Sequence, residues 1–112
     1  MDERDKRAAP RVKVDIDGYI SPNGWLKKEV KIGNISESGV LIKTQVPLFS
    51  LSKVFVKLNL EGKDFEGQAI CVRVSPKPPW EIGLHFVDLD EKNRQVLSEF
   101  IKNKLDSSDE EN

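Results

Sequence analysis

Apolar and polar residues alternate in short runs between residues 11 and 87, and turn residues separate the runs. The clearest example is the face formed by Val54, Val56, Leu58 and Leu60, which alternates with an opposite face of Lys53, Phe55, Lys57 and Asn59. Such alternation predicts β-strands with one face in a core and the other in solvent. We predict six strands, at about residues 12–18, 25–32, 40–44, 54–60, 69–74 and 80–87. Residues 25–32 do not alternate cleanly, so the register of that strand is uncertain, and the pattern as a whole is typical of a small antiparallel barrel or sandwich.

Two of these strands contain positions that predict local details. In 69–74, one face holds Ile70, Val72 and Val74, and Cys71 lies on the other face, where we expect a small, buried and unreactive side chain. Gly83 interrupts the last strand. A glycine inside a strand marks a bulge or a close approach by another group.

A helix is predicted only after residue 87. Val96, Leu97, Phe100, Ile101 and Leu105 form one apolar stripe at helical spacing, which we expect to lie on the barrel. Asp88, with Glu91 three residues later, is a candidate N-cap, and Asp90 is an equally acceptable one. We therefore divide the chain into a flexible N-terminal segment (1–10), a barrel plus helix (11–105) and an acidic disordered tail (106–112).

Size and composition indicate one globular domain. The chain has 112 residues, of which 38% are hydrophobic and 33% charged. No apolar run is long enough to cross a membrane, and no secretory signal is visible, so we expect a cytoplasmic protein without membrane insertion. The net charge of −1 argues against binding to a nucleic-acid polymer. Positive charge is local: residues 1–13 hold five basic and three acidic residues.

Few residues are suited to catalysis or metal binding. One cysteine and one histidine make the usual zinc sites very hard to build. His85 has no recognisable triad partner, and no glycine-rich phosphate loop is present. We therefore expect no enzyme, no metal and no cofactor.

Three short segments remain as candidate functional features. Arg7 and Arg11 are four residues apart, directly before the first strand, although a solvated basic N-terminus would look the same. The segment 34–39, Asn-Ile-Ser-Glu-Ser-Gly, lies between two strands and consists largely of ordinary turn residues. Gly83 begins the sequence Gly-Leu-His-Phe in the last strand.

In order and spacing, the three segments resemble the PilZ domain, a bacterial receptor domain for the second messenger cyclic di-GMP. Its first motif, Arg-x-x-x-Arg, is matched by Arg7 and Arg11. The second, Asp/Asn-x-Ser-x-x-Gly, is matched by Asn34, Ser36 and Gly39. The resemblance covers most of the chain and implies a six-stranded antiparallel β-barrel with a C-terminal α-helix, in agreement with the strand count above.

The resemblance also implies ligand-binding roles. Arg7 and Arg11 would hold phosphate and guanine, Asn34 and Ser36 would hydrogen-bond a guanine, and Gly39 would keep the turn tight and open to the ligand. A guanidinium suits both groups, because it can bind phosphate or the guanine O6/N7 edge bidentately. Weaker candidates for the site are Lys6, Ser38, Gly83 and His85. In the family, the position of Lys6 helps to decide whether one ligand or a stacked pair is bound. Ser38 stands where the family often has glycine, and Asn34 where it often has aspartate.

The expected function is therefore that of a stand-alone cyclic di-GMP receptor. The N-terminal arginine motif would become ordered on binding and would transmit the ligand's level to an effector protein in trans. The main alternative is a PilZ-like adaptor that binds no nucleotide and acts through protein–protein contacts; members of that kind typically lack the arginine pair. A single-stranded nucleic-acid binder would need aromatic residues interleaved with a basic groove, and only 7% of the residues are aromatic. We expect a monomer or a weak dimer.

Overall fold

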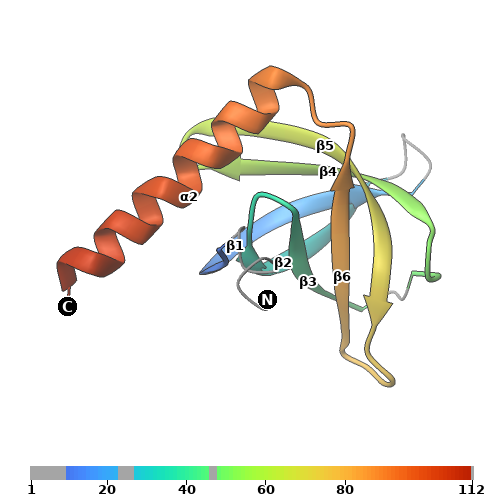
Figure 1. Ribbon diagram of the computed structural model, residues 1–112. Helices are drawn as coiled ribbons and strands as arrows, with labels where there is room; N and C mark the ends of the chain where they lie inside the picture. The colour runs from blue at the N-terminus through green and yellow to red at the C-terminus, as the bar shows by residue number, and fades with distance from the viewer. Residues whose placement is uncertain (1–9, 23–26, 46–47, 112) are drawn as a thin grey trace, which may run out of the picture.

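The computed structural model describes residues 10–22, 27–45 and 48–111, with side chains described up to residue 106. These residues form six strands and one helix (Figure 1): β1 (Val12–Ser21), β2 (Lys28–Ile35), β3 (Gly39–Thr44), β4 (Lys53–Leu60), β5 (Lys63–Val74), β6 (Trp80–Val87) and α2 (Glu91–Glu111). The strands are antiparallel and close into a barrel in the order β1-β2-β3-β6-β5-β4. The predicted fold class is confirmed.

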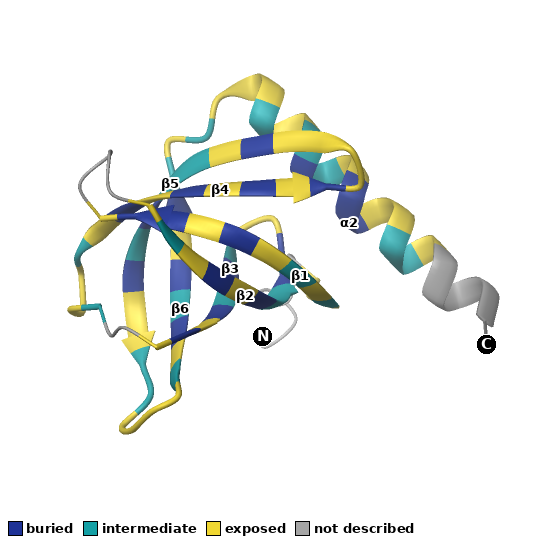
Figure 2. Cartoon of the chain, turned by 180° about the vertical axis from the view of Figure 1, so that it is seen from behind, coloured by how far each residue is buried: buried dark blue, intermediate teal, exposed yellow. Residues whose placement is uncertain are grey.

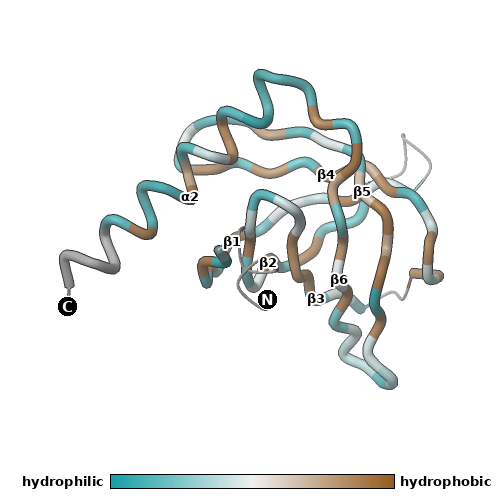
Figure 3. Tube along the Cα trace, viewed as in Figure 1, coloured by the Kyte–Doolittle hydropathy of each residue, from teal (hydrophilic) through white to brown (hydrophobic). Residues whose placement is uncertain are grey.

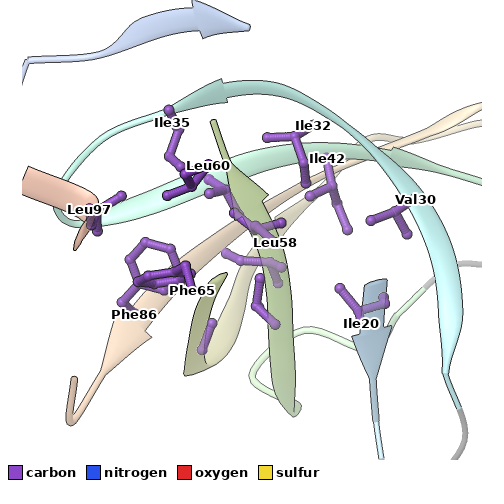
Figure 4. Close-up of a cluster of buried hydrophobic side chains, with 14 of the residues drawn as sticks. Ile20, Val30, Ile32, Ile35, Ile42, Leu58, Leu60, Phe65, Phe86 and Leu97 are labelled. Atoms are coloured by element: carbon purple, nitrogen blue, oxygen red, sulfur yellow. The ribbon is translucent and has the colours of Figure 1, made fainter. Parts of the chain in front are cut away.

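The barrel interior is an apolar core built from alternate residues of each strand. In β4, buried and exposed residues alternate without interruption (Figure 2). Side chains from facing strands meet in the centre (Figure 4), where the rings of Phe65 and Phe86 pack edge to face with centroids 5.2 Å apart. Burial of this apolar surface is the main source of stability for such a barrel.

Three strands differ by three residues or more from their predicted ranges. β1 continues to Ser21, three residues beyond its expected end. β2 begins at Lys28 and ends at Ile35, three residues later at each end than expected; Trp25 lies outside the described residues. Its register shifts between Ile32 and Asn34, which breaks the alternation that the prediction needed. β5 begins at Lys63, six residues early, because pairing with β4 continues to a tight turn at Glu61 and Gly62. Both turn residues have positive φ, as a type I′ hairpin requires.

A β-bulge in β5 changes which of its residues face the core. The pairing of β5 with β6 shifts register between Cys71 and Arg73. Cys71 is fully buried, as expected, whereas Val72 is 54% exposed and Arg73 is also exposed. The prediction that Ile70, Val72 and Val74 share one continuous face was wrong, because a bulge changes the phase of alternation by one residue.

Helix α2 packs one face against the barrel. Its buried residues are Leu97, Phe100 and Ile101, which belong to the predicted apolar stripe. These three residues belong to the same buried cluster as the core residues of the strands. Most of the remaining described helix is hydrophilic (Figure 3). The backbone N–H of Glu66 in β5 also donates a hydrogen bond to Asn93 Oδ1 (2.8 Å), which fixes the first turn of the helix on the sheet.

Helix α2 begins and ends at residues that differ in part from the prediction. The N-cap is Asp90, whose Oδ1 accepts a hydrogen bond from the backbone N–H of Asn93 (2.8 Å). Asp88 has a φ of 54°, outside the helical region, and precedes the helix by three residues. The helix continues to Glu111, where we expected it to end near residue 105 and give way to a disordered tail. Acidic residues oppose the dipole at a helix C-terminus, but no glycine or proline between 103 and 111 forces an earlier end.

Within the described residues, no helix has the length and apolar character needed to cross a membrane.

Candidate ligand-binding site

A pocket of about 150 Å³ lies on the outer surface of the barrel, where the β2–β3 turn meets β3, β6 and β5. Arg11 contributes from the residue directly before β1. The pocket gathers every predicted site residue that the structure describes: Arg11, Asn34, Ser36, Ser38, Gly39, Gly83 and His85. Segments far apart in the sequence are therefore brought to one place, and the binding role of each residue stays a prediction.

The strand register explains why these segments meet. Asn34 in β2 pairs with Leu41 in β3, and Leu41 pairs with Gly83 in β6. Gly83 in turn pairs with Arg73 in β5, so that four neighbouring strands contribute one row of residues. Arg73 is exposed and the other three are partly exposed, so the row lies on the outside of the barrel. The strands that carry it lie beside one another in Figure 1.

Irregular pairing is concentrated around this row. Register shifts occur between Lys13 and Ile16 where β1 pairs with β2, between Ile32 and Asn34 where β2 pairs with β3, and between Cys71 and Arg73 where β5 pairs with β6. Each shift lies beside or within the row. Bulges redirect side chains and are common at barrel rims and next to functional sites. Here they place Asn34 and Arg73 on the same outer surface.

Ser36 organises the β2–β3 turn. Its side chain is 5% exposed, and its Oγ accepts hydrogen bonds from the backbone N–H groups of Ser38 (3.1 Å) and Gly39 (3.2 Å). The hydroxyl groups of Ser36 and Ser38 also lie within hydrogen-bond distance (3.0 Å). Backbone bonds from Ser36 to Gly39 and from Phe86 to Ser38 complete the turn. The structure therefore gives the Ser36 hydroxyl a structural role, while contact with a guanine stays a prediction.

Gly39 is required because two strands approach closely. A Cβ atom at this position would collide with the backbone carbonyl of Leu84 in β6 and would lie 3.3 Å from the Cα of His85. Neighbouring backbone cannot move aside as a flexible side chain can. The glycine therefore allows the turn to pack against β6, a reason that differs from the expected opening toward a ligand.

Gly83, unlike Gly39, has space for a Cβ atom. A Cβ atom there would lie 3.6 Å from Arg73 Cβ and 3.8 Å from Val72 Cγ2, which is ordinary van der Waals contact. The bulge anticipated from this glycine is present, but the extra residue is in the partner strand β5. On the surface of β6, Gly83 leaves a gap in the row of side chains.

The pocket carries positive charge although the protein as a whole has a net charge of −1. Arg11 and Arg73 line it together with His85, and none of its lining residues is acidic. Glu37, within the turn itself, instead accepts a hydrogen bond from Ser98 Oγ of α2 (3.2 Å). An anion would therefore meet two guanidinium groups and no nearby carboxylate in the pocket wall.

Five lining residues of the pocket were missed by sequence reasoning: Val40, Leu41, Val72, Arg73 and Leu84. In a strand without a bulge, Arg73 would face the core together with Cys71, because the two residues are two positions apart. A charged side chain is unfavourable in a core, so its position in the sequence was the one available sign of a bulge. Two predicted residues, Arg7 and Lys6, lie outside the described part of the chain. In that part, no three His, Cys, Asp or Glu side chains are arranged to hold a metal ion.

Comparison with known families gives one match, in which the model of the PilZ domain covers residues 5–103. None of the curated proteins matches the sequence significantly.

Solved structures with the same fold are remote in sequence. The chain is similar to the Bacillus subtilis inhibitor of motility MotI/DgrA (18% identity, TM-score 0.75), with 89% of this chain and 52% of that one covered. It is also similar to the K. pneumonia MrkH–c-di-GMP complex (12% identity, TM-score 0.77), with 95% and 55% covered. The chain thus spans about half the length of these two proteins. For the PilZ domain of Escherichia coli YcgR with c-di-GMP (12% identity, TM-score 0.75), the coverage is 95% and 96%. At these identities the likeness establishes the fold.

Proposed function

Because the chain belongs to the PilZ domain family, we propose that it is a receptor for cyclic di-GMP. The observation that carries the proposal is the single pocket that joins Arg11 to the Asn34–Gly39 turn and to Gly83. Structures of the same fold from MrkH and YcgR contain cyclic di-GMP. Function does not follow from fold alone, so the residues of the pocket are the stronger support.

The pocket has the chemistry that this ligand requires. Cyclic di-GMP carries two negative phosphodiester groups and two guanines. Arg11, and Arg7 from the segment before it, would bind phosphate oxygens or the O6/N7 edge of guanine. The side chain of Asn34 is partly exposed and has no hydrogen bond with any described residue, so its amide is available to a base. The rigid turn built on Ser36 holds Asn34 and Gly39 in place for the ligand.

Transmission of the signal is the second part of the proposal. Arg7 and Lys6 belong to a charged segment with few apolar anchors. We infer that this segment becomes ordered over the ligand and that an effector protein recognises the ordered state in trans. Lys6 would face the additional negative charge if a second ligand stacked on the first.

A calorimetric titration of cyclic di-GMP into the purified full chain tests the receptor function. Wild-type protein should bind saturably, and the Arg7→Ala, Arg11→Ala double variant should show no binding at micromolar ligand. Each charge-assisted contact is worth about 1.5–3 kcal/mol, so either single variant should weaken binding by about ten- to a hundredfold. The stoichiometry of wild type and of Lys6→Ala shows whether one or two ligands bind.

Folding must be verified for each protein by far-UV circular dichroism. Wild-type protein that is folded but gives no heat, and no competition by other guanine nucleotides, would contradict the receptor function. The non-nucleotide-binding adaptor would then be the better account.

A further inference from the structure

Arg73 lines the pocket from β5, at the end of the row away from β2, and none of the sequence motifs contains it. The bulge at Cys71–Arg73 turns it outward, and its Cβ lies beside the empty position over Gly83. Val72 lies next to it and exposes 54% of its surface. β5 therefore presents an aliphatic side chain and a guanidinium along one border of the pocket.

The guanidinium of Arg73 has no hydrogen bond or ion pair with any residue in the described ranges. Some surface cations do have such partners: Lys31 pairs with Asp17 (2.7 Å), Lys63 with Glu99 (3.0 Å), and Arg94 donates to the Leu89 carbonyl (3.3 Å). Others, such as Lys43 and Lys53, have none among the described residues, so it is the position of Arg73 at the pocket that distinguishes it. As far as the described residues go, the guanidinium donors of Arg73 thus remain open to a ligand, at a wall without acidic residues.

The recess over Gly83 has a shape that suits a flat ring. Neighbouring strands lie about 4.8 Å apart, so Leu41 and Arg73, on either side of Gly83, are about 10 Å apart across the sheet. The floor is the backbone of β6, and the two borders are Leu41 on one side and Val72 with Arg73 on the other. A planar base can rest on glycine backbone where a side chain would hold it off.

From this arrangement we propose that Arg73 is a specificity-determining residue that binds the O6/N7 edge of the guanine lying over Gly83. The inference rests on the proposed cyclic di-GMP function and adds a third arginine, from β5, to the two of the N-terminal motif. Guanine presents two acceptors at this edge, which a guanidinium fork matches bidentately. Lysine, a single point charge, would satisfy phosphate but not this edge.

The test compares Arg73→Ala and Arg73→Lys with wild type by calorimetric titration of cyclic di-GMP. Arg73→Ala should weaken binding by about ten- to a hundredfold, and Arg73→Lys should fail to restore it, because the bidentate geometry is lost. Arg94→Ala is the matched control: it removes an exposed arginine outside the pocket and should leave affinity within about twofold. Arg73 is exposed, so each variant should keep the melting temperature of wild type.

A second variant tests the recess without touching a charge. Gly83→Leu should abolish binding by filling the space where the base lies; a Cβ at this position meets only ordinary contacts, and far-UV circular dichroism checks that the larger side chain is accepted. Folded Gly83→Leu that binds as tightly as wild type overturns the placement of the base over Gly83.

The outcomes separate the two proposals. Wild type that binds, with Arg73→Ala unchanged, overturns the role of Arg73 and leaves the receptor function intact. Full recovery in Arg73→Lys shows that only positive charge matters and overturns the guanine-edge contact. Folded wild type that binds nothing overturns the receptor function, and the Arg73 inference falls with it.

Discussion

At the scale of single residues, two glycines of the same pocket have opposite tolerance for a side chain. Gly39 faces the backbone of Leu84 at a distance that excludes a Cβ, whereas Gly83 faces side chains at ordinary contact distance. Overpacking of this kind costs about 1–3 kcal/mol, so Gly39→Ala should lower the free energy of unfolding by that amount. Gly83→Ala should leave it unchanged or raise it, because alanine favours ordered backbone over glycine.

Urea denaturation followed by far-UV circular dichroism measures both variants. Equal loss of stability in the two would show that the tight approach of β3 to β6 at Gly39 is not as described.

The thiol of Cys71 should be inert in the folded protein. It is fully buried, and desolvation raises the pKa of its thiol more than hydrogen bonds with the backbone of Arg73 and Leu51 lower it. When the pKa of a thiol is higher in the folded than in the unfolded state, the resulting stability is fully present below the unfolded pKa. It is lost as the pH rises through the folded pKa. Stability should therefore fall more between pH 8 and 10 for wild type than for Cys71→Ala. Denaturation at each pH checks this, and rapid labelling of native protein by a thiol reagent would contradict the burial.

At the scale of elements, the N-terminus of α2 depends on Asp90. The backbone N–H of Asn93, followed by its side-chain amide, lowers the pKa of the Asp90 carboxyl. When the pKa of a carboxyl group is lower in the folded than in the unfolded state, the resulting stability is fully present above the unfolded pKa. It is lost as the pH falls through the folded pKa. Asp90→Ala should destabilise the protein at pH 7, as the loss of an N-cap does, and should destabilise it less at pH 3.

Asp90→Asn is the matched control, since asparagine caps well without a charge. Its stability relative to Asp90→Ala should be nearly independent of pH over the same range. If the free energy of unfolding of wild type exceeded that of Asp90→Ala by the same amount at pH 3 and at pH 7, a role for the ionised carboxylate would be contradicted.

The strands and the helix also differ in how well the sequence predicted them. Unbroken alternation located β4 and β6, and helical spacing located the buried stripe of α2. Alternation failed in β2 and β5, because bulges near Asn34 and Arg73 change which residues face the core. A bulge is fixed by pairing with neighbouring strands, which local patterning does not contain. The motif residues of the pocket could be predicted from resemblance to a family, whereas Arg73 could be placed there only by the observed register.

At the scale of the whole molecule, the pocket and the helix are connected through the β2–β3 turn. Ser98 of α2 donates to Glu37, which stands between Ser36 and Ser38, the two serines of the turn. Glu37 itself does not line the pocket. A ligand that fixes the turn would therefore act on the middle of α2 through this contact, and an effector could sense the helix as well as the N-terminal segment.

This connection predicts a separation between binding and response. Ser98→Ala removes the hydrogen bond to Glu37 while leaving every pocket residue in place, so affinity for cyclic di-GMP should stay within about twofold of wild type. Amide hydrogen exchange should slow on ligand binding at residues 34–39 in both proteins, because the ligand stabilises the turn. Slowing around residue 98 should occur in wild type and diminish in the variant. Equal slowing there in both would show that coupling to α2 runs through the barrel core, for which Leu97 and Ile101 provide the other contacts.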